Sequence, residues 1–344
     1  MTEHWTRPGF TLGDVGRAGQ ALVEGKADEQ ALEIVNNWRS SHAFPLNTFR
    51  MGLWQRIRAD FPKAIIAQRI KRLPSIKLKL ERNPTMYLPQ MQDIGGCRAV
   101  LPSVPVVREV AAGFPRRPTS RFHHKFQNEK NYIQAPKTDG YRSHHLIYRF
   151  QSPQKPQYNG LRIEVQLRSQ PQHLWATAVE TVGTLTKQSI KASRGTPEWH
   201  RFFALMSSAL AVEEGAQTVP GTPTDARILE VELRKLVVQL DVFNVLTAYR
   251  EALQQAERRT VSRAKYFLLD LRPAEHSVSV REFTTSDLGE ATKAYLELET
   301  SLTGPGAEAV LVSVGSLQNL RAAYPNYFLD TEAFLQTLKR MVQE

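Results

Sequence analysis

The sequence is poor in cysteine: Cys97 is the only one among 344 residues, so disulfides within the chain and cysteine-based zinc sites are excluded. The N-terminus has no apolar signal core, and no apolar run is long enough to span a bilayer. No glycine-rich loop leads into a Lys-Ser or Lys-Thr pair, which excludes nucleotide binding of the P-loop kind. Internal repeats and low-complexity tracts are not visible. We therefore expect a cytoplasmic globular protein that does not bind membranes.

Basic residues exceed acidic ones. The 45 lysines and arginines stand against 34 aspartates and glutamates, for a formal net charge of +11. This excess favours polyanionic partners such as nucleic acid or nucleotides over membranes. A soluble protein that is merely basic is the alternative, because charge alone identifies no ligand.

The pattern of apolar residues predicts an α+β fold in two domains, which this length permits. For residues 1–215 we expect a helical N-terminal region followed by a mixed, largely antiparallel sheet flanked by helices, with helices at 14–60 and 170–189 and strands at 98–101, 144–150 and 161–168. A Pro/Gly/Thr-rich linker at 217–224 precedes a small α+β domain, residues 225–344. That domain is predicted to open with one long amphipathic helix, 225–259. Strands at 265–271, 276–283 and 309–314 and helices at 286–302, 317–323 and 331–342 follow.

Residues 161–168 alternate strictly between apolar and polar side chains, as in a strand with one buried face. The polar face carries Glu164 between Arg162 and Arg168. A carboxylate placed in this way could hold a metal ion or accept a proton from an attacking hydroxyl. Cross-strand ion pairing is the alternative, and it would give Glu164 little importance.

A turn at 136–140 leads into the strand at 144–150 and places Tyr141 at the junction. An aromatic ring at such a position can stack on a purine, at about 1–3 kcal/mol per base. A tyrosine that fills the core is the alternative.

Three further segments carry candidate ligands. The segment 69–79 holds basic and hydroxyl groups where a strand or loop enters a helix, which suits phosphate or else a solvated helix face: Arg69, Lys71, Ser75 and Lys79. Asp93 precedes a glycine pair and is a candidate Mg²⁺ ligand, although Asp-x-Gly is also common in turns. The run 114–125 contains no acid and suits an RNA backbone, or is only a charged loop: Arg116, Arg117, Arg121 and Lys125.

In this order and at these spacings, the segments resemble the RelA/SpoT nucleotide pyrophosphokinase family over about residues 50–190. Residues 69–79 are similar to an ATP-phosphate motif, RxKxxxSIxxK, and residues 93–98 to a magnesium motif, DIxGxR. Residues 130–145, KNYIQAPKTDGYRSHH, are similar to KDYI..PK..GYRSLH, and residues 164–169, EVQLRS, to EVQIRT. This sequence departs from the family pattern at three positions, Asn131, Asp139 and His144.

The resemblance implies transfer of the β,γ-pyrophosphate of ATP to a nucleotide 3′-hydroxyl, with release of AMP. It assigns Mg²⁺ to Asp93 and Glu164, and proton abstraction to Glu164. ATP would be bound by Arg69, Lys71, Ser75, Lys79, Arg98 and Arg108. The acceptor would be bound or supported by Tyr141, Lys130, Lys137, Arg142, His145, Gln166 and Arg168. No His-Asp dipeptide occurs, so we expect a synthetase without the family's hydrolase.

Residues 225–344 resemble the C-terminal domain of CapRel-like fused toxin–antitoxin proteins, because Tyr324 and Tyr327 match a YxxY motif. That resemblance implies that the two tyrosines plug the adenine site, that a phage protein relieves the block, and that the acceptor is the 3′-CCA end of tRNA. The alternative is that their rings fill a small core. Two rival functions stay open: an alarmone synthetase that uses GDP, GTP or an adenine nucleotide, and a catalytically dead module that binds RNA or a partner.

Overall fold

The computed structural model describes residues 5–119, 122–189, 196–244, 246, 266–272, 277–284, 287–302, 308–313 and 332–343. Tyr324, Tyr327, Arg121 and the expected helix at 317–323 lie outside these residues. Within them, no helix combines the length and the apolarity that a membrane span requires.

Helices fill the N-terminal region, as the sequence predicts: α1 (Leu12–Val23), α2 (Glu29–Ser41) and α3 (Ala43–Ile57). The Asp28 carboxylate caps α2 by accepting a hydrogen bond from the Ala31 amide at 2.8 Å. Pro45 lies in the first turn of α3, where the missing N–H costs no helical hydrogen bond.

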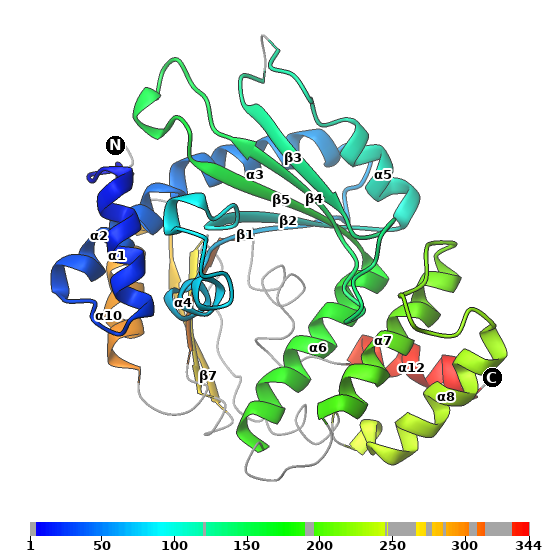
Figure 1. Ribbon diagram of the computed structural model, residues 1–344. Coiled ribbons are helices and arrows are strands. Elements are labelled where there is room, and N and C mark those ends of the chain that lie inside the picture. Colours follow the sequence, from blue (N-terminus) through cyan, green and yellow to red (C-terminus); the bar gives the residue numbers. More distant parts are fainter. Residues whose placement is uncertain are drawn as a thin grey trace.

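The centre of the molecule is one eight-stranded sheet in the order β3-β4-β5-β2-β1-β8-β6-β7 (Figure 1). Its strands are β1 (Ile65–Ile70), β2 (Gly95–Leu101), β3 (Lys125–Asn131), β4 (His144–Arg149), β5 (Arg162–Ser169), β6 (Tyr266–Arg272), β7 (Ser277–Phe283) and β8 (Glu308–Ser313). The β2–β5 pair is parallel and the other pairs are antiparallel. This confirms the mixed, largely antiparallel sheet. The sequence did not assign β1 or β3 as strands.

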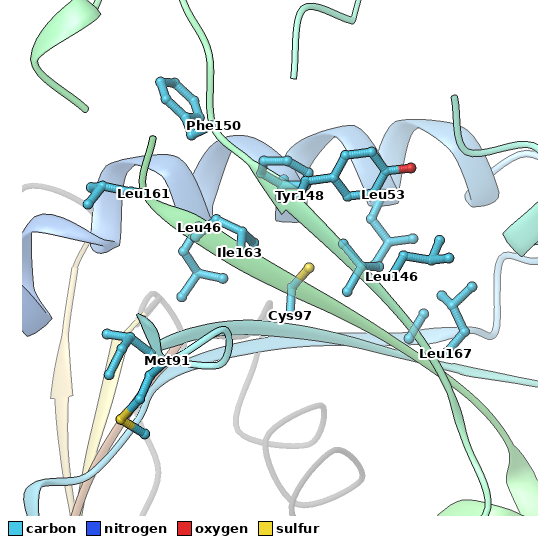
Figure 2. Close-up of a cluster of buried hydrophobic side chains, with 14 of the residues drawn as sticks. Leu46, Leu53, Met91, Cys97, Leu146, Tyr148, Phe150, Leu161, Ile163 and Leu167 are labelled. Carbon is cyan, nitrogen blue, oxygen red and sulfur yellow. The ribbon is translucent and has the colours of Figure 1, made fainter. Parts of the chain in front are cut away.

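The first core lies on one face of the sheet, where α3 and α5 (Val104–Ala112) cover it. Apolar side chains alternate inward from the central strands, as Figure 2 shows for Cys97, Leu146, Tyr148, Ile163 and Leu167. The remaining short elements of this region are α4 (Leu73–Glu81) and the 3₁₀ turns η1 (Leu88–Gln90) and η2 (Pro156–Tyr158). Because strand side chains alternate, the polar positions of β2, β4 and β5 lie on the opposite face.

A second core joins four helices: α6 (Gln170–Ser189), α7 (Thr196–Glu213), α8 (Ala226–Gln239) and α12 (Glu332–Gln343). The sequence predicted α6 and α12 but not α7. The single long helix predicted over 225–259 is interrupted: α8 ends at Gln239, Asp241 takes a left-handed φ of 48°, and residues 242–244 are helical again. Residues 247–259 of that prediction lie outside the described residues.

The two predicted domains share structure. Strand β8, from the region 225–344, pairs with β1, so that Gln68 lies opposite Ser313 and Arg69 opposite Val312. Helix α10 (Leu288–Ser301) packs on β6 and β8 and lies beside α2 in Figure 1. The division near 217–224 stays a prediction, but the strands on its two sides form one sheet.

Candidate active site

Strand register brings the predicted site residues together on the sheet face opposite the first core. One row across the sheet contains Lys130 on β3, His145 on β4, Gln166 on β5 and Arg98 on β2. The neighbouring row contains Glu164 on β5, Gly96 on β2 and Arg69 on β1. Residues from five sequence segments therefore share one surface because their strands pair in this register.

Glu164 is buried, with 6% of its surface exposed, and two neighbours hold its carboxylate. Oε1 lies 2.9 Å from His145 Nδ1, and Oε2 accepts a 2.6 Å hydrogen bond from Gln166 Nε2. Burial would raise the pKa of Glu164, but His145 and Gln166 lower it below its usual value. The negative charge of Asp93 acts to raise the pKa of Glu164, so the two predicted magnesium ligands lie close enough to interact electrostatically. Glu164 is therefore held as an anion.

The arginines that flank Glu164 in the sequence bind other groups. Arg162 donates hydrogen bonds to the Gln127 side chain and to the Pro89 carbonyl, and Arg168 donates to the Tyr141 hydroxyl at 2.9 Å. The cross-strand ion pair that we considered as an alternative role for Glu164 is therefore present, and its partner is His145 on β4.

A tyrosine platform adjoins His145. The Tyr141 hydroxyl lies 2.8 Å from His145 Nε2, and the Tyr132 ring meets the Tyr141 ring edge-on at 5.7 Å. Lys137 Nζ lies over both rings, 4.8 Å from the centroid of Tyr132 and 5.2 Å from that of Tyr141. Burial would raise the pKa of Tyr141, but Arg168 and His145 lower it to about 8. Tyr132 belongs to this platform, although the sequence alone gave it no role.

The turn before β4 positions Tyr141. The Asp139 carboxylate accepts a 2.9 Å hydrogen bond from the Tyr141 amide, and Gly140 takes a φ of 95°. A Cβ at Gly140 would lie 2.7 Å from the Trp175 ring, so only glycine fits this left-handed position. Two of the departures from the family pattern thus have structural roles: Asp139 orders this turn, and Asn131 accepts from the amide of Ile133 at 3.2 Å.

Asp93 lies between two lysines of the predicted phosphate motif. Its carboxylate accepts from Lys71 Nζ at 2.9 Å and from Lys79 Nζ at 2.8 Å. Burial would raise the pKa of Asp93, but the two ammonium groups lower it to about 2. Lys71 directly follows β1, while Ser75 and Lys79 lie on α4, so a strand-to-helix junction assembles this cluster as predicted.

No atom of the described residues fills the space over Gly96, which lies between Arg69 and Glu164 in the row across the sheet. A Cβ built on Gly96 meets no atom within 4 Å, whereas one on Gly95 would lie 2.8 Å from Ile163 Cδ1. Gly96 thus leaves room for a ligand beside Glu164, while Gly95 is needed for packing.

Other predicted residues lie elsewhere. Arg142 is 2% exposed and bonds to Glu214 at 2.7 Å and to Ser207 at 3.1 Å, which favours a structural role. Arg116 bonds to Glu129 at 2.6 Å and lies over the Phe126 ring. Arg108 is exposed on α5 and Arg117 is exposed after it, whereas Lys125 begins β3. The ligand roles of all these residues stay predictions.

These features, two carboxylates and paired lysines facing a tyrosine platform, lie in one segment of the chain. Residues 68–183 match the family profile "Region found in RelA / SpoT proteins". The match identifies the domain as an ATP pyrophosphotransferase with the RelA/SpoT synthetase fold, as the motifs predicted. No curated protein matches the chain.

Solved structures similar to this chain cover about half of it. A GTP pyrophosphokinase family protein from Streptococcus pneumoniae is 20% identical, with a TM-score of 0.41, over 51% of this chain and 86% of its own. Small alarmone synthetase 1 from Bacillus subtilis, bound to its product pppGpp, is 21% identical, with a TM-score of 0.38, over 51% and 88%. Small alarmone synthetase 2 from the same organism is 20% identical, with a TM-score of 0.40, over 50% and 87%.

Proposed function

We propose that this chain is an autoinhibited pyrophosphokinase that transfers the β,γ-pyrophosphate of ATP to the 3′-hydroxyl at the CCA end of tRNA. The observation that carries the proposal is the pairing of two clusters on one sheet face: Asp93 with its lysines, and Glu164 with His145. Phosphoryl transfer depends mainly on positioning and on neutralising charge, and these clusters supply both.

The ATP end is formed by Arg69, Lys71, Ser75 and Lys79. The ammonium groups that pair with Asp93 are also the cations that a triphosphate needs, so phosphate oxygens compete with the carboxylate for them. Ser75 lies in the first turn of α4, where backbone N–H groups favour anions.

Asp93 and Glu164 fit a magnesium site. Both are ionised oxygen donors within electrostatic reach of each other, and Mg²⁺ uses one or two carboxylates together with substrate phosphates. Among the residues that the structure describes, no group of three or more His, Cys, Asp and Glu side chains gathers, so substrate oxygens would complete the coordination. When bound, the ion would neutralise charge on the transferred phosphates.

The acceptor end is the platform of Tyr141, Tyr132 and Lys137. A base stacked on Tyr141 would bring its ribose toward Glu164, which accepts the proton of the 3′-hydroxyl. The oxygen of that hydroxyl forms a bond to the β-phosphorus, the bond from the β-phosphorus to the bridging oxygen breaks, and AMP leaves with that oxygen. His145 binds Glu164 and Tyr141 together and so aligns the base with the acceptor of the proton.

The charge of the chain supports RNA as the acceptor in this proposal. The excess of +11 and the exposed Arg117 favour RNA over a free nucleotide. A free guanine nucleotide is the second candidate, because Arg116, the first of the predicted RNA-binding residues, is already bound to Glu129.

Regulation of the enzyme is part of the proposal. Tyr324 and Tyr327 would block the adenine site until a phage protein binds the C-terminal region, which would make the chain a defence toxin held by its own antitoxin. The support is the Tyr-Pro-Asn-Tyr sequence, with its YxxY spacing, in the region 225–344.

A transfer assay with γ-labelled ATP and Mg²⁺ tests the proposal. The parent and Tyr327→Ala would each receive total tRNA, GDP and GTP together. Label on tRNA, much stronger in the variant, is the expected result. Label on GDP or GTP in the parent would instead make the chain an alarmone synthetase. Absence of transfer in both proteins, with every acceptor, would reject pyrophosphokinase activity.

A further inference from the structure

We propose that Arg39 and Glu299 are positioning residues for ATP, and that helix α10 of the C-terminal region is therefore a working part of the ATP site. This inference rests on the proposed function. It concerns the short connection between β1 and α4, which carries Lys71.

Arg39 is almost fully enclosed, with 1% of its surface exposed, and α10 supplies its counter-charge. Nη1 lies 2.8 Å from Glu299 Oε2, and Nη2 donates to the Tyr295 hydroxyl and, at 3.3 Å, to Glu299 Oε1. Tyr295 and Glu299 are one helical turn apart, and the Tyr295 hydroxyl donates to Glu299 Oε1 at 2.7 Å. The remaining side-chain partner of Arg39 is Asn36 on its own helix, at 2.7 Å.

The same ion pair binds the backbone on both sides of Arg72. Arg39 Nε donates to the Lys71 carbonyl at 3.1 Å, and Glu299 Oε1 accepts from the Leu73 amide at 3.1 Å. Leu73 is the first residue of α4, so a carboxylate from 226 residues further along the chain satisfies one of that helix's open N–H groups. The Lys71 amide is fixed separately by the Ile94 carbonyl at 2.8 Å.

These contacts fix the backbone position of Lys71, from which its side chain extends. With its amide and carbonyl both bonded, Lys71 directs Nζ to Asp93, 2.9 Å away. A buried ion pair is weak evidence for stability alone, because apolar residues can replace one without loss. A guanidinium and a carboxylate can in addition bind a carbonyl and an amide at set positions, which apolar side chains cannot do. The charged groups of Arg39 and Glu299 are therefore suited to holding the connection between β1 and α4, which carries Lys71, in place.

Binding of α,β-methylene-ATP with Mg²⁺ tests the inference, because the bond that transfer would break is blocked and no acceptor is needed. Titration calorimetry would use the full chain with Tyr327→Ala, in which the proposed block is relieved, as the parent for this comparison. Glu299→Gln and Tyr295→Phe would be added to it separately, at a temperature where thermal melting shows each protein to be folded. The matched control is Glu297→Gln, on the exposed side of the same helix, where Glu297 lies 3.8 Å from Lys293. We expect Glu299→Gln to weaken binding at least fivefold, Tyr295→Phe at least twofold, and the control less than twofold.

A Glu299→Gln protein that melts at a lower temperature but binds the nucleotide like the parent would overturn the inference, since the pair would then be structural only. If Glu299→Gln does not fold, Tyr295→Phe decides, because it keeps the ion pair; unchanged binding in that variant would also overturn the inference. Absence of nucleotide binding even in the Tyr327→Ala background, where the proposed block is relieved, would reject the proposed function together with the inference. The direction of the change in nucleotide affinity also separates this role from autoinhibition. Glu299→Gln and Tyr295→Phe should weaken binding, whereas Tyr327→Ala should strengthen it.

Discussion

His145 Nδ1 lies 2.9 Å from Glu164 Oε1, between two strands that place both residues on the same sheet face. The other ring nitrogen of His145 lies 2.8 Å from the Tyr141 hydroxyl. The histidine therefore joins the candidate proton acceptor to the candidate base platform. Its pKa reflects this position: burial would lower it, but Tyr141 and Glu164 raise it above 6.5.

Replacing Glu164 with glutamine should lower transfer at least a hundredfold while the fold is kept. The amide has nearly the same shape and can still bond to Gln166, but it cannot accept the proton or bind a cation as strongly. Initial rates with saturating ATP would measure the loss, and circular dichroism would check the fold. Glu129→Gln on β3, which β4 separates from β5, is the control. Retained activity in Glu164→Gln would remove this carboxylate from the mechanism.

Stability should depend on pH through His145. Because its pKa is higher in the folded state than the ordinary 6.5, its charged form stabilises the fold fully below pH 6.5, and this contribution is lost as pH rises through the folded pKa. From pH 6 to 8 the parent should therefore lose stability relative to His145→Gln. Above pH 8, ionisation of Tyr141 acts in the opposite direction. Urea unfolding at several pH values would measure this. His200→Gln, at an exposed site on α7, should follow the parent, and parallel curves for the parent and His145→Gln would contradict the prediction.

Substitution of two lysines on α4 should change the KM for ATP to different extents. Lys79 pairs with Asp93 at 2.8 Å, whereas Lys77 lies 4.0 Å from Glu81 on the exposed side. Lys79→Met should raise the KM for ATP about tenfold, equivalent to about 1.4 kcal/mol. Lys77→Met should stay within twofold of the parent. Equal effects of the two substitutions would mean that only the overall positive charge of the helix matters.

The adjacent glycines of β2 should give opposite results. Gly96→Val fills open space beside Glu164, so the free energy of unfolding should stay within about 1 kcal/mol of the parent while nucleotide binding is lost. Gly95→Ala forces a Cβ to 2.8 Å from Ile163 Cδ1 and should destabilise the fold by about 1–3 kcal/mol. Chemical unfolding and calorimetric titration with α,β-methylene-ATP would measure both. Normal nucleotide binding by Gly96→Val would place the ligand elsewhere.

Binding to tRNA should distinguish Arg117 from Arg116. Arg117 is exposed, so Arg117→Gln should weaken binding and reduce the slope of log K against log salt by about 0.7–0.9 for one lost phosphate contact. Arg116→Gln should chiefly lower stability, because Arg116 is bound to Glu129 and Phe126. Filter binding between 50 and 200 mM salt would measure the slope, and an unchanged slope in Arg117→Gln would assign Arg117 to a charged loop without RNA contact.

The sequence by itself determined the local features of the site. Strict alternation fixed which face of β5 holds Glu164, and motif spacing predicted the junction that carries Lys71 and the turn before Tyr141. These predictions succeeded because they depend on neighbouring residues only. The sequence did not predict strands β1 and β3, because their short segments, IIAQRI and KFQNEKN, show no clear alternation of apolar and polar residues.

The tertiary structure decided the rest. Partners such as His145 for Glu164 depend on strand register, and the sequence alone named no cross-strand partner for this carboxylate. The pairing of β8 with β1 and the contact of Glu299 with Arg39 join residues more than 200 positions apart. Nothing in local periodicity encodes such contacts, because their stability arises only when both surfaces have already formed. The sequence therefore predicted the residues of the candidate site, and the fold showed that β8 and α10 of the C-terminal region contact β1 and the start of α4.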